Sequence, residues 1–118
     1  MIEAGSRRRS QPAPPHVVLE ALTEPNRDPA RRWLLLLKDE QPPQVIAAER
    51  PNFVVWSSLW AKRADAQIRF DLSADGSGTR LGWALFVVEP LPDFSNLGHM
   101  RKRINELINA NLRFTFGQ

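Results

Sequence analysis

The chain has 118 residues, of which 42% are hydrophobic and 25% charged, a composition typical of a folded domain and unlike that of disordered or membrane proteins. The absence of cysteine excludes disulfides, thiol catalysis and thiolate metal sites, and is compatible with a reducing cytoplasm. The net charge of +3 is dispersed over the chain, so we expect no nucleic-acid partner.

These numbers favour one domain over residues 1–118, located in the cytoplasm, without a cofactor. No window approaches the roughly 20 apolar residues of a membrane span, and the opening MIEAGSRRRS has no apolar segment of the kind found in secretory signals. With only His16 and His99 and no suitable ligand spacing, we expect no metal site.

The first third of the chain predicts a strand followed by two short helices. Ile2–Gln11 is polar, and its Arg7–Arg9 run indicates either a basic patch or, as we prefer, a charged edge strand that discourages pairing with other chains. Pro15 stands where a helix can begin, and Pro25 ends it. Asp28, followed by proline, offers the cap of a second short helix that runs to Trp33.

The middle of the chain predicts strands joined by turns. Trp33–Lys38, Gln44–Glu49 and Phe53–Trp60 are short runs separated by proline-rich segments. Alternation within the third run places Trp56 and Trp60 on the inner face of the sheet.

The clearest local pattern is an antiparallel hairpin over Ala66–Val88. Apolar residues alternate with polar ones before and after the turn sequence SADGSGT, as in half-buried strands. The predicted inner face consists of Ile68, Phe70, Leu72, Leu81, Trp83, Leu85 and Val87.

The segment Pro92–Gln118 predicts a long amphipathic helix that covers this sheet. Asp93 or Ser95 can cap its start, and Gly117 lies at its expected end. Its apolar stripe is formed by Leu97, Met100, Ile104, Leu107, Ile108 and Leu112. The predicted fold class is therefore α+β, with a curved antiparallel sheet of about six strands wrapped around one C-terminal helix.

Several segments resemble the START-like helix-grip superfamily, also called SRPBCC. The resembling motifs are Ala13–Pro15 with Ala21–Pro25, Glu49–Pro51 before a central strand, the turn Gly78–Leu81, and the terminal helix. The resemblance implies a sheet that grips the helix around a cavity. Its polyketide cyclase/dehydrase-like members and related proteins bind sterols, lipids or polyketides, some are cyclases, and others are chaperone activators.

From the aromatic inner face and this resemblance, we expect a binding protein for a small hydrophobic or amphipathic ligand, and not an enzyme. The ligand-binding residues predicted between sheet and helix are Trp56, Trp60, Phe70, Trp83, Leu85, Met100, Arg103, Ile104 and Leu107. Of these, Arg103 would reach a ligand carboxylate at the pocket mouth.

Two alternatives stay open. One is a cyclase or aromatase-like enzyme that uses His99 as acid or base. The other is a chaperone-activator type of interaction module that docks its partner on an apolar outer patch around Phe53, Val55 and Phe86. A homodimer through an edge strand or the outer sheet face is a further expectation, which the sequence does not decide.

Overall fold

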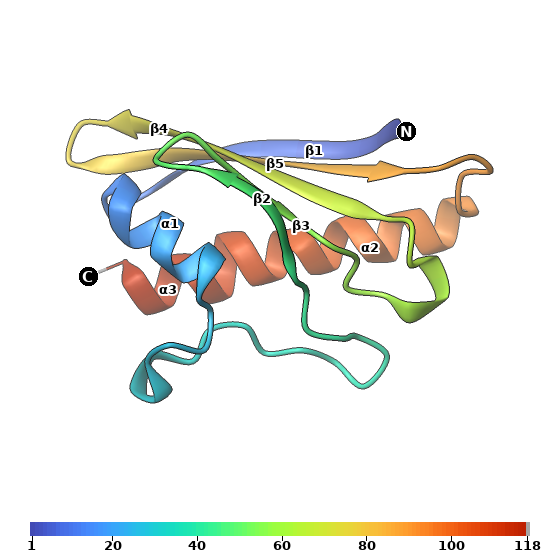
Figure 1. The fold of residues 1–118 in the computed structure, drawn as a ribbon, viewed down its shortest axis with the longest axis horizontal. Helices are drawn as coiled ribbons and strands as arrows, with labels where there is room; N and C mark the ends of the chain where they lie inside the picture. The colour runs from blue at the N-terminus through green and yellow to red at the C-terminus, as the bar shows by residue number, and fades with distance from the viewer. Residues whose placement is uncertain (118) are drawn as a thin grey trace.

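The computed structural model describes residues 1–117. One antiparallel sheet lies on one side of a long C-terminal helix, and a short helix packs at one end between them (Figure 1). The elements are β1 (Ile2–Gln11), α1 (Pro15–Thr23), η1 (Pro29–Arg31), β2 (Val45–Glu49), β3 (Phe53–Trp56), η2 (Ala61–Arg63), β4 (Gln67–Asp75), β5 (Gly78–Val87), α2 (Phe94–Glu106), η3 (Leu107–Leu112) and α3 (Arg113–Phe116). The predicted α+β class is confirmed.

The sheet has the strand order β1-β5-β4-β3-β2, and neighbouring strands are antiparallel. In the predicted hairpin, Phe70 pairs with Trp83 and Ile68 with Leu85, which brings these side chains to the same buried face. The two-residue turn begins with Gly76 at φ +60°, a backbone conformation that glycine adopts at little cost. The inner face predicted from alternation is therefore confirmed.

The sheet has five strands, so the prediction of about six was wrong. Trp33–Lys38 was predicted to be a strand, but it belongs to an irregular segment, residues 32–44, that we call the strap. The strap passes below the C-terminal helix, on the side away from the sheet (Figure 1). Its backbone bonds to side chains and not to a strand, since the Leu37 N–H donates to Glu40 and the Leu35 carbonyl accepts from Arg103.

The strand predicted at Phe53–Trp60 ends at Trp56. The Ser58 hydroxyl accepts the Trp60 N–H at 2.9 Å, and this local bond replaces a ladder hydrogen bond and turns the chain. Trp60 is still buried, as predicted. The second predicted helix is a single 3₁₀ turn, η1, capped by Asp28 as expected.

The terminal helix is continuous from α2 through α3, and its start is capped by Asp93, which accepts the Asn96 N–H at 2.8 Å. The predicted stripe is buried from Met100 to Leu112, and Leu97 packs against it half-buried. Its central section, η3, is a π-helix. In an α-helix, residues four apart drift around the axis by about 40° per step. The wider π turn offsets that drift and keeps Leu112 and Phe116 toward the core.

Buried aromatic rings join α1, the strap and the sheet. Trp56 stacks on Trp33 of the strap with ring centroids 6.0 Å apart, and meets the edge of Phe70 at 4.7 Å. The Trp56 indole N–H donates to the Leu22 carbonyl of α1 at 2.8 Å. None of the helices within residues 1–117 has both the length and the apolar character needed to cross a bilayer.

Candidate functional site

The structure brings the apolar members of the predicted ligand site together as closely packed interior. Each is at most 7% exposed and belongs to a single hydrophobic cluster: Trp56, Trp60, Phe70, Trp83, Leu85, Met100, Ile104 and Leu107. Of these residues, Trp83 borders a cavity, a shallow one of about 330 Å³ between β1 and α2. The prediction that this set lines a ligand site stays a prediction, and a ligand there requires the sheet and helix to move apart.

Arg103, the polar member of the predicted site, is paired within the chain. Its Nε and Nη2 donate to the two carboxylate oxygens of Glu40, each at 2.8 Å, and Nη2 also donates to the Leu35 carbonyl at 3.1 Å. The side chains of Arg103 and Glu40 are 9% and 0% exposed. The guanidinium therefore fastens the strap to the helix, and its donors on this side are already used.

The environment of the pair favours both charges. Burial raises the pKa of the Glu40 carboxyl, but the hydrogen bonds from Arg103 and the Leu37 N–H and the Arg103 charge outweigh burial, so the pKa lies below its usual value. The hydrogen bond to Glu40 raises the pKa of Arg103 despite the opposing effect of burial.

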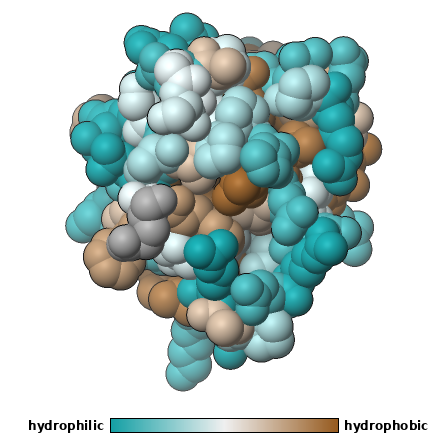
Figure 2. Space-filling view, turned by 90° about the vertical axis from the view of Figure 1, so that its left-hand side faces the viewer, coloured by the Kyte–Doolittle hydropathy of each residue, from teal (hydrophilic) through white to brown (hydrophobic). Residues whose placement is uncertain are grey.

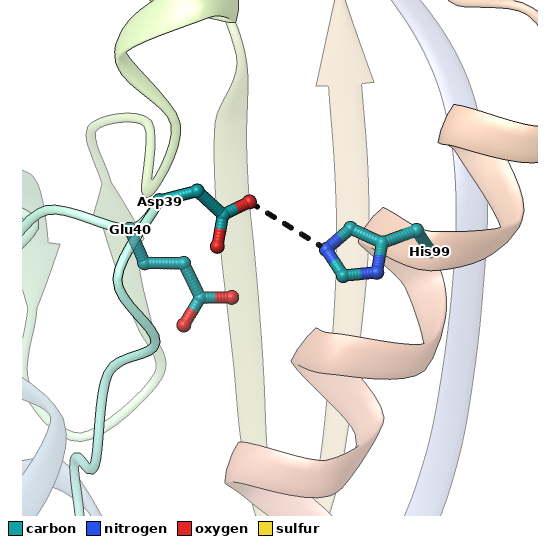
Figure 3. A group of neighbouring side chains, drawn as sticks. All are labelled: Asp39, Glu40 and His99. Carbon is teal, nitrogen blue, oxygen red and sulfur yellow. Dashed lines mark ion pairs between the residues drawn. The ribbon is translucent and has the colours of Figure 1, made fainter.

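His99 lies beside the strap, at the same end of the helix as this pair. Its Nε2 is 3.8 Å from a carboxylate oxygen of Asp39, and its side chain is 47% exposed (Figure 3). Asp39, Glu40 and His99 place one ligand atom each within 4.8 Å of one another. However, both Glu40 oxygens already accept hydrogen bonds, and the nearby Arg103 cation repels a metal ion. We assign no metal site to this group.

The outer patch expected around Phe53, Val55 and Phe86 is half-buried. The Arg69 guanidinium lies 4.4 Å from the centre of the Phe53 ring and covers it. The large apolar side chains that are exposed lie elsewhere, and the most exposed are Phe94 at one end of the terminal helix and Phe114 at the other.

The largest cavity described is a groove at the C-terminal end of the molecule, with a volume of about 760 Å³. We call it the C-terminal groove. One wall is the start of the strap and the other is the terminal helix from η3 onward; the lining residues are Pro12, Arg32, Trp33, Leu35, Asn109, Ala110, Asn111, Arg113, Phe114, Thr115 and Gly117. Figure 2 views this end and shows apolar side chains gathered near the middle of the face, with hydrophilic ones around them.

Hydrogen bonds hold the walls of the groove in position. The Gln11 amide donates to Asn109 at 2.9 Å, and Asn109 donates to Asn105 one turn earlier at 2.6 Å. The Arg113 Nε donates to the Ser10 carbonyl at 3.3 Å, which ties the last turns of the helix to the end of β1. The π-helix thus presents amide and guanidinium groups at a place where its wider turns change the direction of the side chains.

Sequence reasoning missed the C-terminal groove. Its walls come from segments about 80 residues apart in the chain, and local patterns do not show which distant segments meet. One signal was present: Asn109, Ala110 and Asn111 interrupt the apolar stripe for three consecutive residues, which marks a section of the helix with a second role.

The topology and the long helix define an α+β protein of the helix-grip class, and known structures support this. The chain is similar to the Aha1 dimer of Colwellia psychrerythraea (15% identity, 98% of this chain and 96% of that one, TM-score 0.70). It is also similar to CalU16 of Micromonospora echinospora (20% identity, 88% and 68%, TM-score 0.65) and to DynU16 of the dynemicin biosynthetic locus (20%, 88% and 44%, TM-score 0.62).

These likenesses confirm the predicted resemblance at the level of the fold: the chain has the helix-grip fold of the START-like proteins. No protein-family model matches the chain, and no curated protein sequence matches it significantly. Because one fold carries many functions, function has to be argued from the site.

Proposed function

We propose that this protein binds a small amphipathic molecule, without catalysis, and that the ligand lies in the C-terminal groove. The observation that carries the proposal is the groove itself. Its volume of about 760 Å³ falls in the range of roughly 300–1,000 Å³ that ligand sites occupy. The interior between sheet and helix, where sequence reasoning placed the ligand, is filled by side chains that are at most 7% exposed.

The lining of the groove suits binding better than catalysis. Trp33 and Phe114 supply aromatic surface, and Phe114 is 83% exposed with little protein around it. The ionisable groups of the lining are two arginines, which do not exchange protons near neutral pH. His99 does not border the groove, so the enzyme alternative has no acid or base at this position.

The biosynthetic-locus origin of DynU16 associates the fold with small-molecule metabolism, and this supports the proposal only by analogy. Binding energy would come mainly from burial of apolar surface, at about 25 cal/mol per Å² before the entropy of association is subtracted. A homodimer stays a prediction, and nothing in the groove depends on it.

The test uses N-phenyl-1-naphthylamine, a neutral apolar dye that becomes fluorescent in apolar surroundings. We expect saturable binding to the wild type. Ala110→Trp fills the groove from its exposed helical wall and should weaken the dye's binding at least tenfold. Ala64→Trp is the matched control, because Ala64 is exposed in the turn before β4, at the other end of the molecule (Figure 1).

A third variant separates the groove from the interior. Ile104→Met roughly conserves volume in the core, so it should leave dye binding unchanged if the ligand lies in the groove. Weakened binding in Ile104→Met together with unchanged binding in Ala110→Trp would place the ligand in the interior and refute the groove. Native mass spectrometry of the protein purified from its host would then identify the bound molecule.

A further inference from the structure

The charges around the C-terminal groove are of one sign. Its lining contains Arg32 and Arg113 and no aspartate or glutamate. The chain as a whole has 16 basic and 13 acidic side chains, so a lining with cations alone differs from the balance of the protein. Two guanidinium groups that face one cavity without a carboxylate attract an anion.

These cations are largely without protein partners. Within residues 1–117, Arg32 makes no ion pair and no side-chain hydrogen bond, and the one bond of the Arg113 side chain is the long one from Nε to the Ser10 carbonyl. The other surface arginines behave differently. Arg27, Arg63 and Arg69 each pair with a neighbouring carboxylate.

The groove also contains other hydrogen-bond donors without acceptors. The indole N–H of Trp33 is buried and has no partner among the described residues, and an unmet buried donor is costly to the fold. The Asn111 amide and the Thr115 hydroxyl make no side-chain hydrogen bond within residues 1–117 either. The lining therefore offers donors, cations and aromatic surface together, with Asn109 already satisfied by Gln11 and Asn105.

We infer that the ligand of the C-terminal groove is an amphipathic monoanion, with a carboxylate or sulfonate head held by Arg32 and Arg113 and an apolar or aromatic body against Trp33 and Phe114. This inference rests on the proposed function and adds the chemical class of the ligand. A planar anionic head can accept two parallel bonds from one guanidinium, which fixes its orientation as well as its affinity.

The test compares two dyes that share one body. 8-Anilinonaphthalene-1-sulfonate carries the anionic head, and N-phenyl-1-naphthylamine lacks it. We expect the sulfonate to bind the wild-type protein about tenfold more tightly. Arg32→Gln and Arg113→Gln should each weaken the sulfonate about fivefold to tenfold and leave the neutral dye unchanged, because a single charge-assisted bond is worth roughly that factor.

Lys62→Gln is the charge-matched control, since it removes one exposed positive charge in η2, away from the groove. It should change neither dye's affinity. Arg32 makes no contact whose loss would unfold the chain, so its variant remains informative if Arg113→Gln loses stability with the Ser10 bond. Displacement of the neutral dye by decanoate but not by decanol extends the test to carboxylates.

The outcomes separate the inference from the proposed function. Tighter binding of the sulfonate that depends on both arginines supports both. Equal affinity for the two dyes, or a sulfonate preference that survives both arginine variants, overturns the anionic ligand and leaves the groove as a binding site. Failure of both dyes to bind overturns the proposed function as well.

Discussion

The buried pair between Arg103 of α2 and Glu40 of the strap gives the most direct test of the structure. The change is Arg103→Met, which keeps most of the side-chain length and removes the guanidinium. Glu40 is then left with a fully buried carboxylate and one remaining hydrogen bond, from the Leu37 N–H. The strap also loses the bond that Arg103 donates to Leu35.

The expected loss is large because both side chains are shielded from water. Removing one partner of a buried ion pair costs about 3–5 kcal/mol, mostly as the penalty of the charge that remains. The unfolding entropy for 118 residues is about 0.25 kcal/mol/K, so the melting temperature should fall by about 12–20 °C. A solvent-exposed pair, by comparison, contributes about 0–1 kcal/mol.

The assay is thermal and urea unfolding of four proteins: the wild type, Arg103→Met, Glu40→Leu and the double variant. We expect the double variant to recover most of the stability lost in Arg103→Met, since it removes the unpaired charge as well. A fall below about 1 kcal/mol in Arg103→Met, or an additive loss in the double variant, would show that the strap does not lie on the helix as described.

Three further predictions address the same fold. Acid should reverse the effect of the Arg103→Met change. In the wild type, the lowered pKa of Glu40 contributes stability above its usual pKa of about 4.5 that is lost as pH falls through the folded value. In the variant the unpaired burial raises the pKa of Glu40, so unfolding free energy should rise between pH 7 and pH 4.5; a parallel decline in both proteins would contradict this. Gly98→Ala should stabilise the fold by up to about 1 kcal/mol in thermal unfolding, because Gly98 lies inside α2 with open space where a Cβ would stand; a loss would show a close contact there. Gly78→Ala should cost about 1–3 kcal/mol by the same measurement, because its Cβ would collide with the backbone carbonyl of Gln11; a neutral result would argue against the β1–β5 register.

The elements that the sequence predicted well are those whose pattern is local. The alternation of Ile68, Phe70 and Leu72 on β4, matched on β5, fixes both the hairpin and its buried face. The stripe from Met100 to Leu112 likewise predicts the helix and its buried side.

The strap shows why the strand prediction failed. Trp33–Lys38 is as apolar as a strand, but a strand also needs a neighbour with free backbone groups. Here the strap lies against a helix, whose backbone is already bonded, so its own groups bond to Glu40 and Arg103 side chains. Nothing near Trp33 in the chain indicates a partner 70 residues away.

The candidate site depends on the same kind of long-range information. Sequence patterns identified Trp56 and Trp83 as inward-facing, which is confirmed, but not whether a void remains between them. That depends on how side-chain volumes fill the interior. Similarly, Arg32 and Arg113 are ordinary surface arginines in the sequence, and become a pair only when the strap meets the end of the helix.

The π-helix η3 makes the C-terminal groove a matter of chain length. Removing one residue from Leu107–Leu112 would return this section to α-helical bonding and turn all later residues by about 100° around the axis. Arg113 and Phe114 would then leave the groove, and Phe116 would leave the core. Relatives with a one-residue deletion here would keep the fold and lose this surface, whatever side chains they carry. Helix length over these six positions, more than overall similarity, would therefore distinguish proteins that share the groove from those that share only the fold.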